Sequence, residues 1–254
     1  MISILVNGCN GKMGQEVLST MDDFENLNLF GGFDRENTGC FPFPVYTSIS
    51  ELSLVTEKPD VIIDFSVPDA TFAILEYAKQ YHIPIVIATT GFSEEQKEQL
   101  HIASQSLPIF QSANMSFDIC LMTKILQLVA TNLKGNDIEI VETHHNRKID
   151  APSGTALLLA DKIKEALGGC VSYEFDRHSK HEKRSPQEIG FSSIRGGNIV
   201  GEHSVQFFGQ NETFEITHRC YSRKVFAEGA LKACEFITKQ PNGYYTMEHL
   251  VSFQ

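Results

Sequence analysis

The stretch ISILVNGCNGKMGQEVLSTM, residues 2–21, joins an apolar run to a helix-like run through a glycine-rich turn. ISILV predicts a buried strand, and GKMGQEVLSTM predicts a helix. Between them, Gly8, Gly11 and Gly14 form a G-x-x-G-x-x-G pattern. Glycines at a strand–helix turn permit a tight bend and close approach to a pyrophosphate, which the helix N-terminus then stabilises. The stretch therefore predicts the first strand–turn–helix unit of a dinucleotide-binding sheet.

Four more strand candidates extend this unit. They are LNLFGGFD at 27–34, DVIIDFS at 60–66, IPIVIATTG at 83–91 and LPIFQS at 107–112. Helix-like segments at 68–82 and 93–105 separate the later strands, and Pro68 suits a first helical turn. Apolar strands alternating with helices indicate a parallel sheet covered on both faces. The predicted fold class is therefore α/β, a Rossmann-type doubly wound sheet.

The expected cofactor is a nicotinamide dinucleotide. Asp34 ends the second strand about 20 residues past the glycines, where a carboxylate accepts hydrogen bonds from the adenosine ribose. Asp34 would repel a 2′-phosphate and so favours NADH, whereas Lys12 and Arg35 could pair with that phosphate and favour NADPH. Both cofactors therefore remain open.

The ends of two later strands supply further cofactor contacts. Ligands of open α/β sheets bind beyond the carboxyl ends of the strands. We therefore expect the nicotinamide ribose and ring to border Ala88, Thr89, Thr90, Ser112, Ala113, Asn114 and Met115. The alternative is that these polar residues only build turns.

The chain changes character past Asn114. A helix is predicted over 116–133, a strand over 137–145, and another helix begins at the SGTAL segment. Residues 187–222 resemble consecutive strands with turns at 196–197 and 210–211. We interpret this half as an antiparallel sheet with helices, a second α+β domain. The final helix, 224–240, could belong to either domain.

The segment HHNRKIDAPSGTAL, residues 144–157, gathers hydrogen-bond donors in an acidic protein. Strand alternation sends His144 and His145 to opposite faces, and we find no carboxylate or thiol in register with them, so no metal site is predicted. Lys148, His144 and the amides of Gly154 and Thr155 at a helix start suit a small molecule bearing carboxylates. The alternative is a plain strand–loop–helix connection with surface charges.

Composition limits the possible partners. The chain has 254 residues, 42% of them hydrophobic, with a formal net charge of -11 and an isoelectric point near 5.3. An acidic chain of this kind is not expected to bind nucleic acid or anionic membranes. Neither a membrane span of about 18 apolar residues nor a secretory signal is recognisable. Six scattered cysteines without metal-ligand spacing indicate free thiols and a cytoplasmic protein.

Several segments together resemble the dihydrodipicolinate reductase family. They are VNGCNGKMG, DFS, ATTGF, SANMS, HHNRKIDAPSGTAL, SIRGGNIVGEH, ITHRCYSRKVFAEGAL and PNGYYTM, which run from the first strand to the C-terminus. The E-x-H-H-x-x-K-x-D-A-P-S-G-T-A segment is far more specific than the glycine turn. The resemblance implies NADH- or NADPH-dependent reduction of 4-hydroxy-tetrahydrodipicolinate or dihydrodipicolinate to tetrahydrodipicolinate, in the diaminopimelate route to lysine. It also implies a homotetramer.

The resemblance further implies domains and residue roles. Residues 1–114 and 224–254 would form the dinucleotide-binding domain, and 115–223 the substrate-binding and oligomerisation domain. His144 would be the catalytic proton donor or acceptor and Lys148 a proton donor that also pairs with a carboxylate. The expected substrate contacts are His145, Gly154 and Thr155, and the pyrophosphate would lie on Gly8, Cys9, Asn10, Gly11, Lys12 and Met13. Ala88 departs from the glycine of many relatives by one methyl group.

Two other classes of protein are open from the residues alone. A thiol-dependent aldehyde dehydrogenase would need a cysteine nucleophile, for which Cys120 is the candidate, although it falls in an apolar helical run. A non-catalytic NAD(P)H sensor would share the nucleotide fold but would not need the HHNRK cluster.

Overall fold

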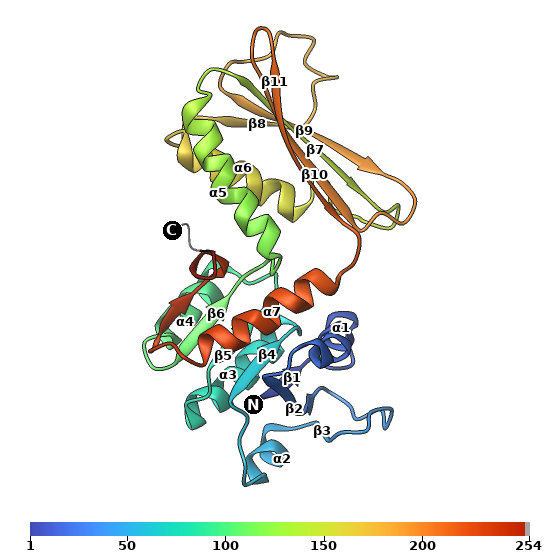
Figure 1. The fold of residues 1–254 in the computed structure, drawn as a ribbon, viewed down its shortest axis with the longest axis vertical. Coiled ribbons are helices and arrows are strands. Elements are labelled where there is room, and N and C mark those ends of the chain that lie inside the picture. Colours follow the sequence, from blue (N-terminus) through green and yellow to red (C-terminus); the bar gives the residue numbers. More distant parts are fainter. Residues whose placement is uncertain (252–254) are drawn as a thin grey trace. The chain divides into compact units, whose positions relative to one another are not determined.

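The computed structural model describes residues 1–251 and divides them into two compact units. One unit comprises Met1–Phe117 together with the chain from Arg223 onward, and the other comprises Asp118–Ser222. Each unit is built on its own sheet (Figure 1). No helix within residues 1–251 is both long enough and apolar enough to span a bilayer.

The first unit holds a parallel sheet of seven strands in the order β12-β6-β5-β4-β1-β2-β3. Its strands are β1 (Ile2–Asn7), β2 (Leu27–Phe33), β3 (Val45–Tyr46), β4 (Val61–Asp64), β5 (Ile85–Ile87), β6 (Pro108–Gln111) and β12 (Gly243–Tyr245). The predicted Rossmann-type sheet is confirmed. The two short edge strands, β3 and β12, were not predicted, because two or three residues carry no recognisable apolar pattern.

Helices cover both faces of this sheet. They are α1 (Lys12–Thr20), α2 (Ile49–Leu54), α3 (Pro68–Tyr81), α4 (Glu94–Ala103) and α7 (Lys224–Ile237), with single 3₁₀ turns at Met21–Asp23 and Met247–His249. Helices α2, α3 and α4 pack around one apolar core that includes Leu52, Ile74 and Leu100. Helices α1 and α7 contact each other, and α7 packs on β4, β5 and β6 (Figure 1). The final helix therefore belongs to the nucleotide-type unit.

Local signals account for where these helices begin and end. Ser93 and Gln96 form a capping box at the start of α4, with each side chain bonded to the other residue's backbone amide. Pro68 occupies the first turn of α3, and His82 ends that helix in a left-handed conformation with φ of 54°.

The second unit holds a mixed sheet in the order β11-β10-β7-β9-β8, which corrects the expectation of an antiparallel sheet. Its elements are α5 (Phe117–Asn132, all but its first residue), β7 (Asp137–His144), α6 (Gly154–Ala166), β8 (Ser172–Glu174), β9 (Glu188–Arg195), β10 (Gly201–Phe208) and β11 (Thr213–Cys220). Strand β9 runs parallel to both β7 and β8, whereas β10 is antiparallel to β7 and β11. Helices α5 and α6 share an apolar core with one face of this sheet.

The link between β9 and β10 explains the difference. These strands do not pair with each other, because β7 lies between them. Their connection instead crosses the end of β7, where Gly196 N–H donates to the His144 carbonyl and Asn146 N–H donates to the Gly197 carbonyl. This crossing brings residues 195–203 beside His144.

Candidate active site

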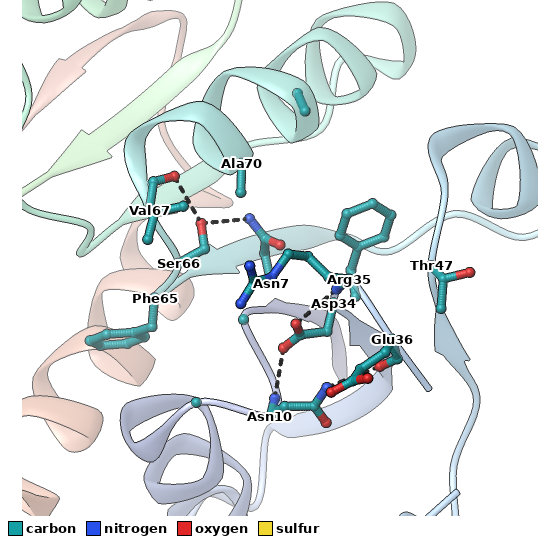
Figure 2. A pocket seen from close by; sticks show the side chains of 14 residues that line it. Asn7, Asn10, Asp34, Arg35, Glu36, Thr47, Phe65, Ser66, Val67 and Ala70 are labelled. Carbon is teal, nitrogen blue, oxygen red and sulfur yellow. Dashed lines mark hydrogen bonds between the residues drawn. The ribbon is translucent and has the colours of Figure 1, made fainter. Parts of the chain in front are cut away.

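A pocket of about 800 Å³ opens at the carboxyl ends of the central parallel strands of the first unit. It is lined by Asn7, Gly8, Asn10, Gly11, Phe33, Asp34, Arg35, Glu36, Thr47, Phe65, Ser66, Val67, Ala70 and Ala73. Figure 2 shows Asp34, Arg35 and Glu36 after β2, with Ser66 and Val67 just before α3 and Ala70 in its first turn. The size and position of the pocket suit a dinucleotide.

The glycine turn forms the floor of this pocket and depends on glycine at two positions. Gly8 has φ of +81°, and a Cβ there would lie 2.7 Å from the Phe65 carbonyl oxygen. A Cβ on Gly14 would lie 2.1 Å from the Gly8 carbonyl oxygen, so α1 packs directly on the turn. These are the two steric demands of a nucleotide-binding turn, and the chain therefore fits a pyrophosphate there.

Asp34, which directly follows β2, is hydrogen-bonded to the glycine turn. Its carboxylate accepts the Asn10 N–H at 2.9 Å and the Arg35 N–H at 2.8 Å. The position at the pocket wall is where a carboxylate meets ribose hydroxyls. Glu36 also lines the pocket and was not singled out from the sequence, although it directly follows Asp34 and Arg35.

The other residues expected to contact cofactor lie outside the pocket walls. Cys9 is fully buried beneath the turn, where burial and the nearby Asp34 raise the pKa of its thiol to about 11. Lys12 and Met13 begin α1. Ala88, Thr89 and Thr90 follow β5, and Ser112 to Met115 follow β6. Met115 is held by α7, because a Cβ on Gly229 would lie 1.7 Å from its carbonyl oxygen.

A buried carboxylate, Asp64, organises the same strand ends and was missed in the sequence. It accepts hydrogen bonds from the Asn7 amide at 2.7 Å and from the hydroxyls of Ser66 and Thr71 at 2.5 Å each and of Thr89 at 2.9 Å. Burial raises the pKa of this carboxyl group. Asp64 thus ties the ends of β1, β4 and β5 to the start of α3. The sequence feature that could have identified Asp64 is its position as the last residue of an apolar strand.

The second unit places Glu142 and His144 together. Burial alternates along β7, so the side chains of Glu142 and His144 lie on the same covered face. His144 Nδ1 is 2.5 Å from a Glu142 carboxylate oxygen. The expectation that no carboxylate lies in register with His144 is therefore wrong, since residues two apart on a strand share a face. This contact with Glu142 fixes the orientation of the His144 ring through Nδ1.

Arg195 holds Glu142 from β9. Its two terminal nitrogens each donate to a different carboxylate oxygen of Glu142 at 2.8 Å, and one also donates to the Asp150 carbonyl at 2.6 Å. Burial alone would raise the pKa of Glu142. Hydrogen bonds from Arg195 and His144 nevertheless lower this pKa to about 2. Burial lowers the pKa of His144, against the opposing effect of Glu142. Near neutral pH the pair is a carboxylate and a neutral imidazole.

The start of α6 adjoins this pair. Ser153 caps the helix by accepting the Ala156 N–H at 3.1 Å, and its own N–H donates to Glu142 at 3.2 Å. Gly154 is exposed, and a Cβ there would meet nothing within 4 Å. Gly154 therefore has open space beside it at the N-terminus of α6, the end of a helix that favours an anion, and Thr155 follows it in the first turn.

Lys148 and His145 lie in the loop after β7. The Lys148 ammonium is 2.8 Å from the Asp150 carboxylate, and hydrogen bonding to Lys148 lowers the pKa of Asp150. His145 is fixed through its backbone, whose N–H donates to the Ile199 carbonyl at 2.8 Å. The expected residues His144, Lys148, Gly154 and Thr155 thus come from one continuous loop and its flanking elements.

The structure argues against the thiol-dependent alternative. Cys120 lies inside α5 and is only 7% exposed, so an aldehyde could not reach its sulfur. Within residues 1–251, no cluster of three or more histidine, cysteine, aspartate or glutamate side chains is arranged to hold a metal ion.

A parallel sheet with a glycine turn at its centre is the architecture of dinucleotide-binding proteins, and comparison with known proteins narrows this class. A family profile described as dihydrodipicolinate reductase, N-terminus, matches residues 2–115, and the C-terminus profile of the same name matches residues 118–251. The chain belongs to the dihydrodipicolinate reductase family, and it is an NAD(P)-dependent oxidoreductase.

Individual relatives are similar to this chain over almost its whole length. A 4-hydroxy-tetrahydrodipicolinate reductase of Caldanaerobacter subterraneus subsp. tengcongensis is 47% identical, covering 99% of this chain and 98% of the relative. That of Staphylococcus carnosus is 44% identical, covering 94% and 96%. A dipicolinate-bound dihydrodipicolinate reductase from Paenisporosarcina sp. TG-14 superposes with a TM-score of 0.82 at 28% identity, covering 99% and 100%.

Proposed function

We propose that this enzyme reduces 4-hydroxy-tetrahydrodipicolinate, or the dihydrodipicolinate formed from it by loss of water, to tetrahydrodipicolinate. The reaction would serve the diaminopimelate route to lysine. The names of its relatives support this substrate. The observation that carries the proposal is the setting of His144, a proton-transfer group beside the lysine and helix-end amides that suit a dicarboxylate.

The proposed roles follow from the atoms that each residue offers. When bound, the reduced nicotinamide supplies a hydride to the conjugated imine ring, on which enamine character and negative charge then develop. Neutral His144 keeps its proton on Nδ1, which faces Glu142, so its Nε2 would take up a proton from solvent and pass it to the ring. The Lys148 ammonium binds one carboxylate and stabilises the developing anion. The Gly154 and Thr155 amides bind the second carboxylate, and His145 contacts substrate.

We propose that both NADH and NADPH are used, within about tenfold of each other. Asp34 and Glu36 in the pocket favour NADH, since they would repel a 2′-phosphate, and Arg35 in the same wall favours NADPH. Lys12, at the exposed start of α1, adds a second cation near this corner. The proposed cofactor site also includes the strand-end segments 88–90 and 112–115.

We further propose that the first unit binds the dinucleotide and the second binds substrate and forms a homotetramer. One face of the second sheet is covered by α5 and α6, but the opposite face carries the partly exposed apolar side chains of Val141, Ile194 and Phe208. Such a sheet face suits burial against other copies of the chain. The free cysteines are consistent with a cytoplasmic location.

The test is a coupled assay in which substrate is made in situ from pyruvate and aspartate semialdehyde, followed by the loss of NADH or NADPH absorbance. Wild type should turn over with both cofactors. His144→Ala and Lys148→Ala should lower kcat by roughly 10² to 10⁴ and still bind NADH, because proton transfer and charge stabilisation are lost. A larger kcat loss for His145→Ala than for His144→Ala would reverse the assignment within the pair. Tight NADH binding without any turnover would instead indicate a sensor.

Binding of pyridine-2,6-dicarboxylate tests the anion site separately from the chemistry. Lys148→Ala should weaken binding to the NADH complex by one to two orders of magnitude, the equivalent of a charge-assisted bond of about 1.5 to 3 kcal/mol. Arg147→Ala is the matched control, since this exposed neighbour donates to Asn198. Equal affinities of wild type and Lys148→Ala in calorimetric titration would remove the support for a dicarboxylate substrate.

A further inference from the structure

A second buried histidine, His203, lies beside the proposed site and takes no part in the proton transfer described above. It is 3% exposed on β10, where it pairs in register with Glu142 of β7 and His218 of β11. Its ring packs edge-on against His144, with 5.1 Å between ring centroids. A polar ring so deeply buried requires a specific hydrogen-bonding partner.

The partner of His203 is the residue that caps α6. The Ser153 hydroxyl oxygen lies 2.8 Å from His203 Nε2 and also accepts the Ala156 N–H at 3.1 Å. The hydroxyl oxygen has a second lone pair and one proton, so it can accept from Nε2 or donate to it. Burial lowers the pKa of His203 to about 3, so the ring is neutral and is held through Nε2, because its Nδ1 has no hydrogen-bond partner within residues 1–251.

Ser153 joins three parts of the proposed site. Its backbone N–H donates to Glu142, the partner of His144, at 3.2 Å. Its hydroxyl caps α6, and the next residues, Gly154 and Thr155, form the first turn of that helix. Ser153 itself is 1% exposed, so its rotamer is decided by protein contacts. A change at His203 is therefore transmitted to the helix start through one hydroxyl group.

We propose that His203 is a positioning residue for the substrate dicarboxylate. Through its hydrogen bond with the Ser153 hydroxyl, it fixes the first turn of α6, so that the amides of Gly154 and Thr155 face the anion before substrate arrives. The inference rests on the proposed function, because it assumes that this helix start binds a carboxylate. It assigns His203 to binding geometry, whereas His144 carries the proton.

The test uses pyridine-2,6-dicarboxylate titrated calorimetrically into the NADH complex, together with steady-state kinetics. His203→Leu should weaken binding of this probe about tenfold and raise the substrate KM to match, because the Ser153 hydroxyl loses its hydrogen bond with the ring. The variant should keep NADH affinity, and kcat should fall less than about threefold, since proton transfer is retained. His203→Gln, whose amide can both donate and accept, should recover most of the affinity.

His218→Gln is the matched control. His218 occupies the neighbouring strand in register with His203, whereas the Ser153 hydroxyl bonds to His203 and Ala156, so the loss of His218 should leave probe affinity unchanged. Equal losses in the His203 and His218 variants would overturn the proposal, because they would show only general damage to the sheet. Unchanged affinity in His203→Leu with intact NADH binding would also overturn it.

A double-mutant cycle covers the case in which His203→Leu does not fold. Ser153→Ala removes the same hydrogen bond from the other side, and combined with His203→Phe, which keeps a ring but cannot bond Ser153, it should lose no more affinity than Ser153→Ala alone. Additive losses would overturn the proposal. Failure of the wild type to bind the probe would refute the proposed dicarboxylate function itself, and this inference with it.

Discussion

Acidification should destabilise the fold through His203, and the effect can be sized from its burial. Its pKa in the folded protein is about 3 because burial disfavours the charged imidazolium, whereas the ordinary value is 6.5. A histidine whose folded pKa is depressed contributes full stability above the unfolded pKa. That stability is lost as pH falls from about 6.5 toward 3, because the unfolded chain then binds a proton that the folded chain excludes.

The expected loss is about 1.4 kcal/mol per pH unit below 6.5, so about 2 kcal/mol of unfolding free energy between pH 7 and pH 5. At 3% exposure, solvent screens the ring little. Urea denaturation followed by far-ultraviolet circular dichroism at pH 7, 6 and 5 measures this loss. His203→Gln cannot titrate, so the stability difference between wild type and variant should shift by about 2 kcal/mol toward the variant at pH 5. Parallel curves for the two proteins would refute the reasoning.

Three further changes test the site. Gly201→Ala would place a Cβ 3.1 Å from His144 Nε2. In the coupled assay kcat should therefore fall at least about tenfold, while NADH affinity stays unchanged. A kcat equal to that of wild type would mean that Nε2 is not the reacting atom. Asp150→Asn should strengthen pyridine-2,6-dicarboxylate binding up to about fivefold in calorimetry, because the Asp150 carboxylate competes with the ligand carboxylate for Lys148. Weaker binding by the variant would contradict this competition. Lys12→Ala should raise KM for NADPH more than for NADH, and equal increases would show that Lys12 does not meet the 2′-phosphate.

The nucleotide-type sheet was predictable because its signals are local. Each long strand is a short apolar run, and the glycine turn carries steric requirements that no other residue type meets. Asp34 was identified from its distance along the chain, and it does lie in the pocket wall. The opposite wall, around Ser66 and Val67, was not identified, because nothing in those residues distinguishes a cofactor contact from an ordinary helix start.

The order in which strands pair in the second sheet could not be predicted from local sequence signals. Strands β9, β10 and β11 lie where the pattern predicted them, yet the turn at Gly196–Gly197 does not make a hairpin. Which strands pair depends on which apolar faces meet in the core. Strand β7 pairs with both β9 and β10, and the spacing of these strands along the chain does not predict that order.

For the candidate site, the sequence by itself determined the continuous loop with His144, Lys148 and the Ser153–Thr155 turn, since neighbouring residues stay near one another in any fold. It also contained Glu142, which strand alternation would have placed beside His144. Only the tertiary structure decided that Arg195 and His203 complete this cluster. They lie about 50 residues away in the chain, and the crossing of the β9–β10 connection over the end of β7 brings them to His144. Hydrogen bonds of a few ångströms between such distant residues follow from how the sheet assembles, and no local preference specifies them.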